Sequence, residues 1–226
     1  MANKKKINLR KEKKITITKD GPYLVSEGIP LSKDIMVCSE DGSAVGWKKG
    51  KEISTEETYA LCRCGQSKSK PFCNGAHFTS KFDGSETASE EKYLDGAEKL
   101  VGPKLVLTDK GEFCNHSGFC TVGAGVWDAT LDSNNPKSKK LAIKEACNCP
   151  TGRLAVWDKN GKAIEPKHKK SIGLIEEPEG PGALWVKGKI PIESSCKKKY
   201  ETRNRMCFCR CGKSSNKPFC DGSHLE

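Results

Sequence analysis

The sequence has no long hydrophobic run. No apolar stretch approaches the length of a membrane span or of the apolar centre of a secretory signal peptide, and the first 20 residues, MANKKKINLRKEKKITITKD, are basic. Hydrophobic residues make up only 35% of the 226 residues, which is little to fill one large core. We therefore expect a cytoplasmic chain that does not bind membranes, made of small domains fastened by more than core packing.

Common functional motifs are also missing. No nucleophile–base pair, phosphate-binding loop or substrate motif is present, so we do not expect an enzyme. The net charge is +11, but lysines occur in short groups among acidic residues, without a recognition-helix or RNA-binding signature. We expect no nucleic-acid binding, and a basic surface suited to acidic partner proteins.

Cysteine, in contrast, is abundant: the chain has 13. Two explanations compete, namely a secreted disulfide framework and ligation of metal inside a cell. The count is odd, and the cysteines are grouped as Cys-x-Cys rather than spread evenly. Together with the basic N-terminal stretch, this pattern favours ligation.

One cysteine-rich stretch occurs twice. Residues 62–77 and 209–224 share the pattern C-R-C-G-x-S-x-x-K-P-F-C-[ND]-G-[AS]-H with every spacing preserved, and a Gly-Pro turn with an apolar run and an Ile-Pro precedes each copy. The repeat therefore extends to a whole module. Alternation predicts a hairpin over residues 15–25 and a strand pair over 183–192, while Asn74 and Asp221 are expected to cap a short helical turn that carries the histidine.

Each copy supplies three thiols and one imidazole, a set that suits either zinc or a [2Fe-2S] cluster. Zinc sites usually take two cysteines two to four residues apart. With a single residue between them, the first two cysteines would share one iron and leave the third cysteine and the histidine for the other, so the spacing favours a cluster. The candidate ligands are Cys62, Cys64, Cys73 and His77 in the first copy and Cys209, Cys211, Cys220 and His224 in the second.

A different signature lies between the copies. Cys114 and Cys120 in CNHSGFC keep the outer two cysteines of the bacterial ferredoxin run, and Cys149-Pro150 supplies the remote Cys-Pro. Three cysteines suit a [3Fe-4S] cluster, or a [4Fe-4S] cluster with another fourth ligand. The candidates for that fourth place are His116, Ser117 and Cys147. We expect residues 131–140, LDSNNPKSKK, to form an exposed loop.

The two repeated stretches resemble the CDGSH (NEET) iron-sulfur family, and the segment between them is similar to a divergent single-cluster ferredoxin domain. The resemblance implies two [2Fe-2S] clusters with three-cysteine, one-histidine ligation, acid-labile and transferable, in a prokaryotic protein. It implies an α+β fold of small β-rich modules, paired as an intrachain pseudo-dimer with the ferredoxin-like domain inserted. The expected parts are a basic tail over 1–13, CDGSH modules over 14–83 and 171–226, and the cluster domain over 84–170. The first copy departs from the family pattern at Asn74, where the family has Asp.

Three functions follow from these expectations. The first is one-electron transfer, or cluster storage and transfer, with redox proteins or apo cluster acceptors as partners, by a monomer with an internal pseudo-two-fold. The second is a redox or iron sensor that acts through a partner interaction. The third is a zinc-bound structural scaffold.

Overall fold

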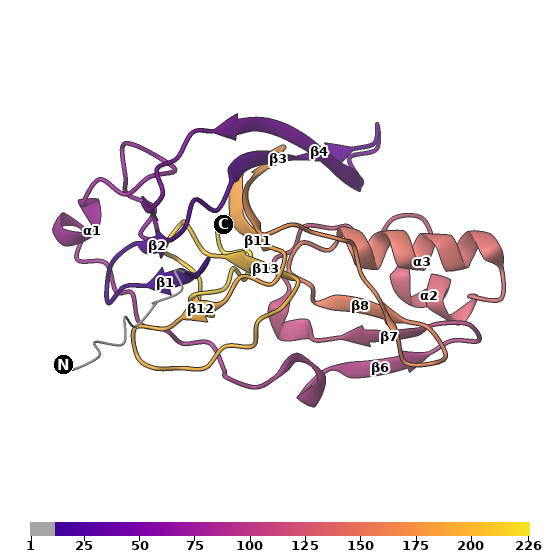
Figure 1. Ribbon diagram of the computed structural model, residues 1–226. Helices are drawn as coiled ribbons and strands as arrows, with labels where there is room; N and C mark the ends of the chain where they lie inside the picture. The colour runs from indigo at the N-terminus through magenta and orange to yellow at the C-terminus, as the bar shows by residue number, and fades with distance from the viewer. Residues whose placement is uncertain (1–11) are drawn as a thin grey trace, which may run out of the picture.

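The computed structural model describes residues 12–226, so most of the expected basic tail lies outside the described residues. This part of the chain is strand-rich with few helices, and its strands form three sheets (Figure 1). Two sheets combine strands from both ends of the chain, and the third belongs to the middle. No helix among residues 12–226 is long and apolar enough to cross a membrane.

The first two sheets exchange strands between the repeats. One sheet has the order β12-β1-β2-β5 and the other β13-β11-β10-β3-β4. In both, the strand that follows the Ile-Pro of one repeat pairs in parallel with the opening strand of the other repeat. Their bounds are β1 (Ile15–Ile17), β2 (Tyr23–Val25), β3 (Leu31–Cys38), β4 (Ala44–Ile53), β5 (Tyr59–Leu61), β10 (Ser171–Glu177), β11 (Gly180–Lys187), β12 (Ile192–Glu193) and β13 (Arg205–Phe208).

Equivalent backbone hydrogen bonds mark the two exchanges. The amide of Ile15 donates to the carbonyl of Pro191 at 3.0 Å, and the amide of Ile172 donates to the carbonyl of Pro30 at 2.9 Å. Each proline lacks an amide hydrogen but keeps its carbonyl oxygen, so the Ile-Pro turn can still accept a hydrogen bond from the opposite repeat.

One core lies beneath both sheets. The alternating sequence around each Gly-Pro turn directs one side chain in two inward, as period-two patterning requires. The rings of Tyr23 and Phe208, one from each repeat, lie 5.2 Å apart between centroids. Burial of each large apolar side chain contributes roughly 1.5–3 kcal/mol, and because the core draws on both repeats, neither repeat completes it alone.

The prediction of a hairpin over residues 15–25 is confirmed, since β1 and β2 pair in antiparallel fashion. The strand pair predicted over 183–192 is wrong. β11 pairs with β10 and β13, whereas β12 crosses to β1. Apolar alternation identified both strands but could not identify their partners, and the pairing with β1 buries Ile190 fully in the shared core.

The middle of the chain forms an antiparallel sheet with the order β6-β7-β8-β9, and two helices pack on it (Figure 1). Its core is separate from the shared core. The elements are β6 (Glu98–Val101), β7 (Val106–Asp109), α2 (Gly125–Leu131), α3 (Pro136–Asn148), β8 (Leu154–Trp157) and β9 (Ala163–Ile164), with short 3-10 turns η1 (Tyr93–Asp95) and η2 (Gly111–Phe113).

The exposed loop predicted over residues 131–140 is only partly correct, because α3 begins at Pro136. The side chain of Asn135 accepts a hydrogen bond from the amide of Lys137 at 3.0 Å, and Pro136 occupies the first helical position. An Asn-Pro pair at these positions is a standard helix start, and it was the overlooked signal.

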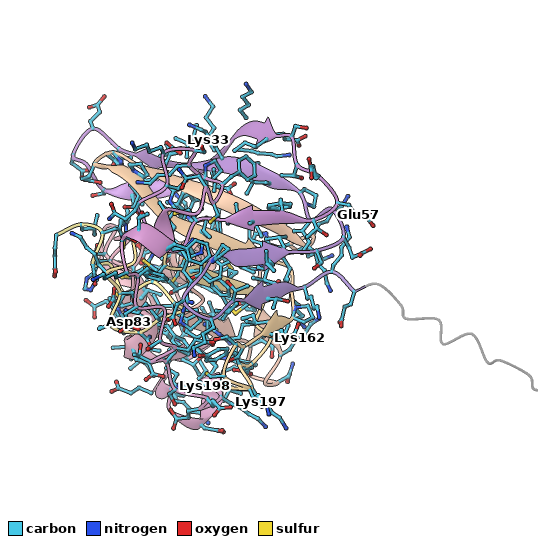
Figure 2. The ribbon with its side chains drawn as sticks, turned by 90° about the vertical axis from the view of Figure 1, so that its left-hand side faces the viewer. Lys33, Glu57, Asp83, Lys162, Lys197 and Lys198 are labelled. Carbon is cyan, nitrogen blue, oxygen red and sulfur yellow. The ribbon has the colours of Figure 1, made fainter. Side chains whose placement is uncertain are left out.

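The lysines labelled in Figure 2 do not gather in one patch. Figure 2 labels Lys33 at one end of the view, Lys197 and Lys198 at the other, and Lys162 between them. This distribution agrees with charge that occurs in short groups along the sequence.

Candidate metal centres

The two repeated ligand loops have the same backbone framework. Each Cys-x-Cys follows a strand, β5 or β13, and each third cysteine returns to that strand. The amide of Cys73 donates to Ala60 and that of Cys220 to Cys207, at 2.9 and 2.8 Å. A serine inside each loop, Ser67 or Ser214, donates to the carbonyl just before the third cysteine. The sequence repeat is therefore a structural repeat down to single hydrogen bonds.

We call Cys62, Cys64, Cys73 and His77 the first site, and Cys209, Cys211, Cys220 and His224 the second site. In each, the donor atoms lie in two pairs. The sulfurs of the Cys-x-Cys are 3.8 Å apart in the first site and 3.6 Å apart in the second. The third sulfur lies 3.4 or 3.5 Å from histidine Nδ1.

Among residues 12–226, no three His, Cys, Asp or Glu side chains are gathered around the position of a single ion. The donors of each site lie instead in two pairs. Thiols and a neutral imidazole nitrogen fit the donor chemistry of an iron-sulfur cluster. The assignment of individual ligands stays a prediction.

The sulfurs also receive support from nearby donors. The amide of Gln66 donates to Cys64 Sγ at 3.5 Å, and the amide of Gly75 donates to Cys73 Sγ at 3.4 Å. In the second site, a hydrogen bond from Cys209 lowers the pKa of Cys211 to about 6. A lowered pKa favours the thiolate, which is the form that binds metal.

The two sites meet back to back through their Cys-x-Cys-Gly turns. Gly65 has a φ of 75°, and a Cβ on it would lie 2.4 Å from the carbonyl oxygen of Cys211. Reciprocally, a Cβ on Gly212 would lie 2.8 Å from the carbonyl oxygen of Cys64. Both contacts are closer than real Cβ atoms approach, so only glycine fits at either position.

The loops that end in histidine are held differently. Asn74 Oδ1 accepts one hydrogen bond, from the amide of Ala76 at 3.2 Å. The Asp221 carboxylate accepts four, from the amides and hydroxyls of Ser215 and Ser223. Burial acts to raise the pKa of Asp221, but these hydrogen bonds outweigh it and hold the pKa below its ordinary value. The second loop is therefore fixed at more points than the first.

The predicted helix caps are wrong: Gly75 occupies the N-cap of the helix in the first copy, and the second copy has no helix. Asn74 and Asp221 instead accept hydrogen bonds from the amides two residues later, those of Ala76 and Ser223. The helix of the first copy, α1 (Ala76–Thr79), begins after Gly75 and carries His77. In the second copy the equivalent residues form a turn.

The two histidines have different surroundings. His77 packs its ring against Phe78, which is 80% exposed. The side chain of His224 is only 8% exposed, and its Nε2 lies 2.9 Å from an oxygen of Glu177. Hydrogen bonding with Cys220, and then with Glu177, raises the pKa of His224 to about 10.

A cavity in the middle unit brings together the three cysteines of the ferredoxin-like signature. Cys114, Cys120 and Cys149 all line it, and so does Ser117. The hydroxyl of Thr151 lies 3.4 Å from Cys149 Sγ. Burial raises the pKa of Cys120 to about 11. Three thiols in one cavity fit a cluster in their donor chemistry.

The three candidates for a fourth ligand separate in space. Ser117 lines the cavity, and its hydroxyl lies 2.9 Å from Asn115 Oδ1. Cys147 Sγ instead donates to the carbonyl of Ile164 at 3.6 Å. His116 faces the second site, where its ring lies 2.6 Å from the position of a Cβ on Gly222. Ligation by any of the three stays a prediction.

Sequence reasoning missed Arg153 in this cavity. Its guanidinium forms two hydrogen bonds with the Asp109 carboxylate, at 2.6 and 2.8 Å, and lies over the ring of Trp127. A fixed cation beside thiolates stabilises their negative charge. The available signal was its position four residues after Cys149, but nothing in the sequence indicated its orientation.

Two other arginines join the middle unit to the second repeat. Arg205 donates to the carbonyl of Cys149 at 2.7 Å, and Arg203 donates to that of Thr151 at 2.9 Å. Arg203 also lies over the rings of Phe113 and Phe219, the residues just before Cys114 and Cys220. Burial lowers the pKa of Arg203 to about 10. No motif in the sequence indicated this contact.

Comparison with known families identifies these regions. The family described as iron-binding zinc finger CDGSH type matches residues 20–78 and 181–225, and the family described as divergent 4Fe-4S mono-cluster matches residues 100–159. The chain is an iron-sulfur protein with two CDGSH-type regions. Its two CDGSH regions contain the first and second sites and flank the mono-cluster region. Neither a curated protein nor a solved structure matches the chain.

Proposed function

We propose that this CDGSH protein carries two [2Fe-2S] clusters and one [3Fe-4S] or [4Fe-4S] cluster and transfers single electrons among them. Iron-sulfur clusters supply reversible one-electron chemistry over a wide range of potentials. Cys62 and Cys64 would bind one iron and Cys73 with His77 the other, and the second site would repeat this arrangement. Cys114, Cys120 and Cys149 would hold the middle cluster.

The observation that supports electron transfer is that the three ligand loops contact one another in series. The middle loop touches the second site, because a Cβ on Gly222 would lie 3.2 Å from the carbonyl oxygen of Asn115. The second site touches the first through the reciprocal approach of Gly65 and Gly212. Direct loop contact supports short electron steps, with the second site between the other two.

We further propose that the two CDGSH regions form an intrachain pseudo-dimer and that the protein is a monomer. The support is the reciprocal strand exchange, in which β12 joins the first repeat and β3 joins the second. A single chain thereby contains both halves of the pair.

An acidic redox protein is the proposed partner, docking over the first site. Lys68 and Asn74 line a groove there, and the neighbouring Phe78 is 80% exposed. An exposed aromatic side chain with a nearby cation is typical of an interaction surface. In this proposal the protein acts in the cytoplasm of a prokaryote and is not an enzyme by itself.

The middle cluster type follows from the fourth ligand. Three thiols in the cavity suit [3Fe-4S], whereas [4Fe-4S] would need another donor, for which Ser117 is the candidate that lines the cavity. An anaerobic iron and sulfide count with EPR before and after reduction tests the assignment. A [3Fe-4S] centre gives a signal in the oxidised sample, and the [2Fe-2S] sites give signals only on reduction.

Three other functions remain as proposals with distinct tests. Stopped-flow reduction by a ferredoxin partner without cluster loss supports electron transfer, while passage of iron and sulfide to an apo-acceptor supports delivery. A change in partner affinity with cluster state supports a sensor. A colourless protein without visible charge-transfer absorption would support the zinc scaffold and contradict all three iron-sulfur functions.

A further inference from the structure

Glu177 is a buried carboxylate whose hydrogen-bond partner is the second-site histidine. Its side chain is 4% exposed and that of His224 is 8% exposed, with 2.9 Å between Oε2 and Nε2. Its other oxygen, Oε1, has no hydrogen-bond partner among the described residues. Burying a carboxylate is costly unless it is paired, so the contact with the imidazole ring offsets the cost of burying Glu177.

The first repeat has no equivalent of this carboxylate. Five residues separate Ile17 from its strand partner Tyr23, whereas nine separate Leu174 from its partner Leu184. Arg63 donates to the carbonyl of Thr18 and Arg210 to that of Ile175, both at 3.3 Å, which aligns these two positions. Glu177 therefore lies in the extension that only the second hairpin has.

Gly182 is part of the same extension and leaves room for the carboxylate. A Cβ on Gly182 would lie 2.6 Å from Glu177 Oε1. Among residues 12–226, no carboxylate hydrogen-bonds the ring of His77, which packs instead against exposed Phe78. The difference between the histidines thus comes from local structure outside the ligand motif.

A carboxylate that accepts the Nε2 hydrogen has two effects on a ligating imidazole. It fixes the tautomer and the ring orientation, so that the Nδ1 lone pair faces the metal, and it makes that nitrogen a stronger donor. In the second site Nδ1 lies on the side of Cys220 and Nε2 on the side of Glu177, as this role requires.

Resting on the proposed [2Fe-2S] sites, we propose that Glu177 is a positioning residue that holds the His224 imidazole for iron. The second site then retains its cluster, and the first site, without such a carboxylate, exchanges its cluster. This assigns delivery to the first site and a permanent electron relay to the second.

The test compares Glu177→Gln with Glu176→Gln in the full-length holo-protein. Glu176 precedes Glu177 on the same strand and forms an ion pair with Lys33 at 3.5 Å instead of a hydrogen bond with the histidine, so its variant is the matched control. Cluster loss is followed at neutral pH by visible absorption and iron release to a ferrous chelator. Cluster loss from two sites should give two kinetic phases. The His77→Cys variant assigns them, because the phase that it slows belongs to the first site.

We expect a fast phase from the first site and a slow phase from the second. Glu177→Gln should speed the slow phase about tenfold, since a neutral amide oxygen is a weaker acceptor than a carboxylate and changes to such a second partner typically weaken metal binding by 10- to 100-fold. The fast phase should not change, which also reports intact folding. Glu176→Gln should leave both phases unchanged.

The reduction potential of the second site distinguishes a role that depends on the charge of Glu177 from a purely structural role. Gln keeps the size and the hydrogen-bond acceptor of Glu but lacks its charge, so a structural role would be preserved. Loss of the charge should raise the potential of the second site in Glu177→Gln alone. If Glu177→Gln matches Glu176→Gln in both loss rate and potential, the inference is wrong. If the wild-type protein holds no pair of [2Fe-2S] clusters, the proposed function itself fails.

Discussion

The two CDGSH regions share a ligand motif and a backbone framework but differ in what surrounds the histidine. In both loops a serine hydroxyl donates to the carbonyl before the third cysteine, and the amide of that cysteine donates to the strand that precedes the Cys-x-Cys. The second site adds the four hydrogen bonds of Asp221 and the carboxylate of Glu177, while the first has Asn74 and an exposed aromatic neighbour. A duplicated motif can therefore keep one donor set and still produce two unequal sites.

The largest expected effect comes from breaking the contact between the sites. Gly65→Ala would place a Cβ against the Cys211 carbonyl at a φ of 75°, so clash and backbone strain add. We expect a loss of about 3 kcal/mol or more in unfolding free energy and lower cluster content at both sites. Thermal melting with iron counts measures both.

Gly42→Ala is the matched control for that variant. Gly42 also has a positive φ, 83°, but nothing lies within 4 Å of its Cβ position. It should cost about 1 kcal/mol and leave cluster content unchanged. Loss at only one site in Gly65→Ala would argue against a shared contact between the loops.

An intermediate effect is expected from exchanging the residue that follows the third cysteine of each site. Asp221→Asn removes a charge that accepts four hydrogen bonds, so it should destabilise the second loop by about 1–2 kcal/mol and raise the potential of that site. Asn74→Asp restores the charge at the first site and should lower its potential. EPR-monitored redox titration of both variants measures the shifts, and movement of either potential in the opposite direction would contradict the assignment.

The smallest effect on the difference between the two sites is expected from Glu145→Gln, which lies outside both and serves as a reference. Glu145 in α3 is 2% exposed, and burial raises its pKa from 4.5 to about 7. Below pH 4.5 the carboxyl is protonated both folded and unfolded. Between about 4.5 and 7 only the unfolded chain ionises, so folding stability falls as pH rises.

Glu145→Gln removes that dependence. The variant should melt a few degrees higher than the wild type at pH 8 and at the same temperature at pH 4.5, as measured by calorimetry. Equal melting temperatures at both pH values would show that burial of Glu145 carries no cost. Because Glu145 lies in the middle unit, the change should not alter the inequality of the two histidine sites.

The sequence predicted the parts of the site that depend on local spacing. The two ligand sets, the 15–25 hairpin and the grouping of Cys114, Cys120 and Cys149 were all predicted from sequence patterns. The structure forms the hairpin and places the three cysteines around one cavity. In each ligand set it places the donors in two pairs, and the sets themselves stay a prediction. The start of α3 was also readable, because Asn135-Pro136 is a local signal.

The remaining features depend on tertiary contacts. Apolar alternation marks β12 as a strand but does not reveal that it pairs with β1. Glu177 lies 47 residues from His224 in sequence, within a segment that reads as an ordinary charged turn. Arg203 and Arg205 could be surface charges on sequence alone, but Arg205 is buried and Arg203 is half-buried, and both donate to carbonyl groups in the loop of Cys149. Such residues have no signature until the modules are assembled.

The most direct test is an EPR-monitored redox titration of the full-length holo-protein, with His77→Cys used to assign the first site. We predict two separate one-electron [2Fe-2S] steps, the second site having the lower potential because Asp221 and Glu177 place negative charge beside it. Equal potentials for the two sites, or a lower potential for the first, would contradict the account.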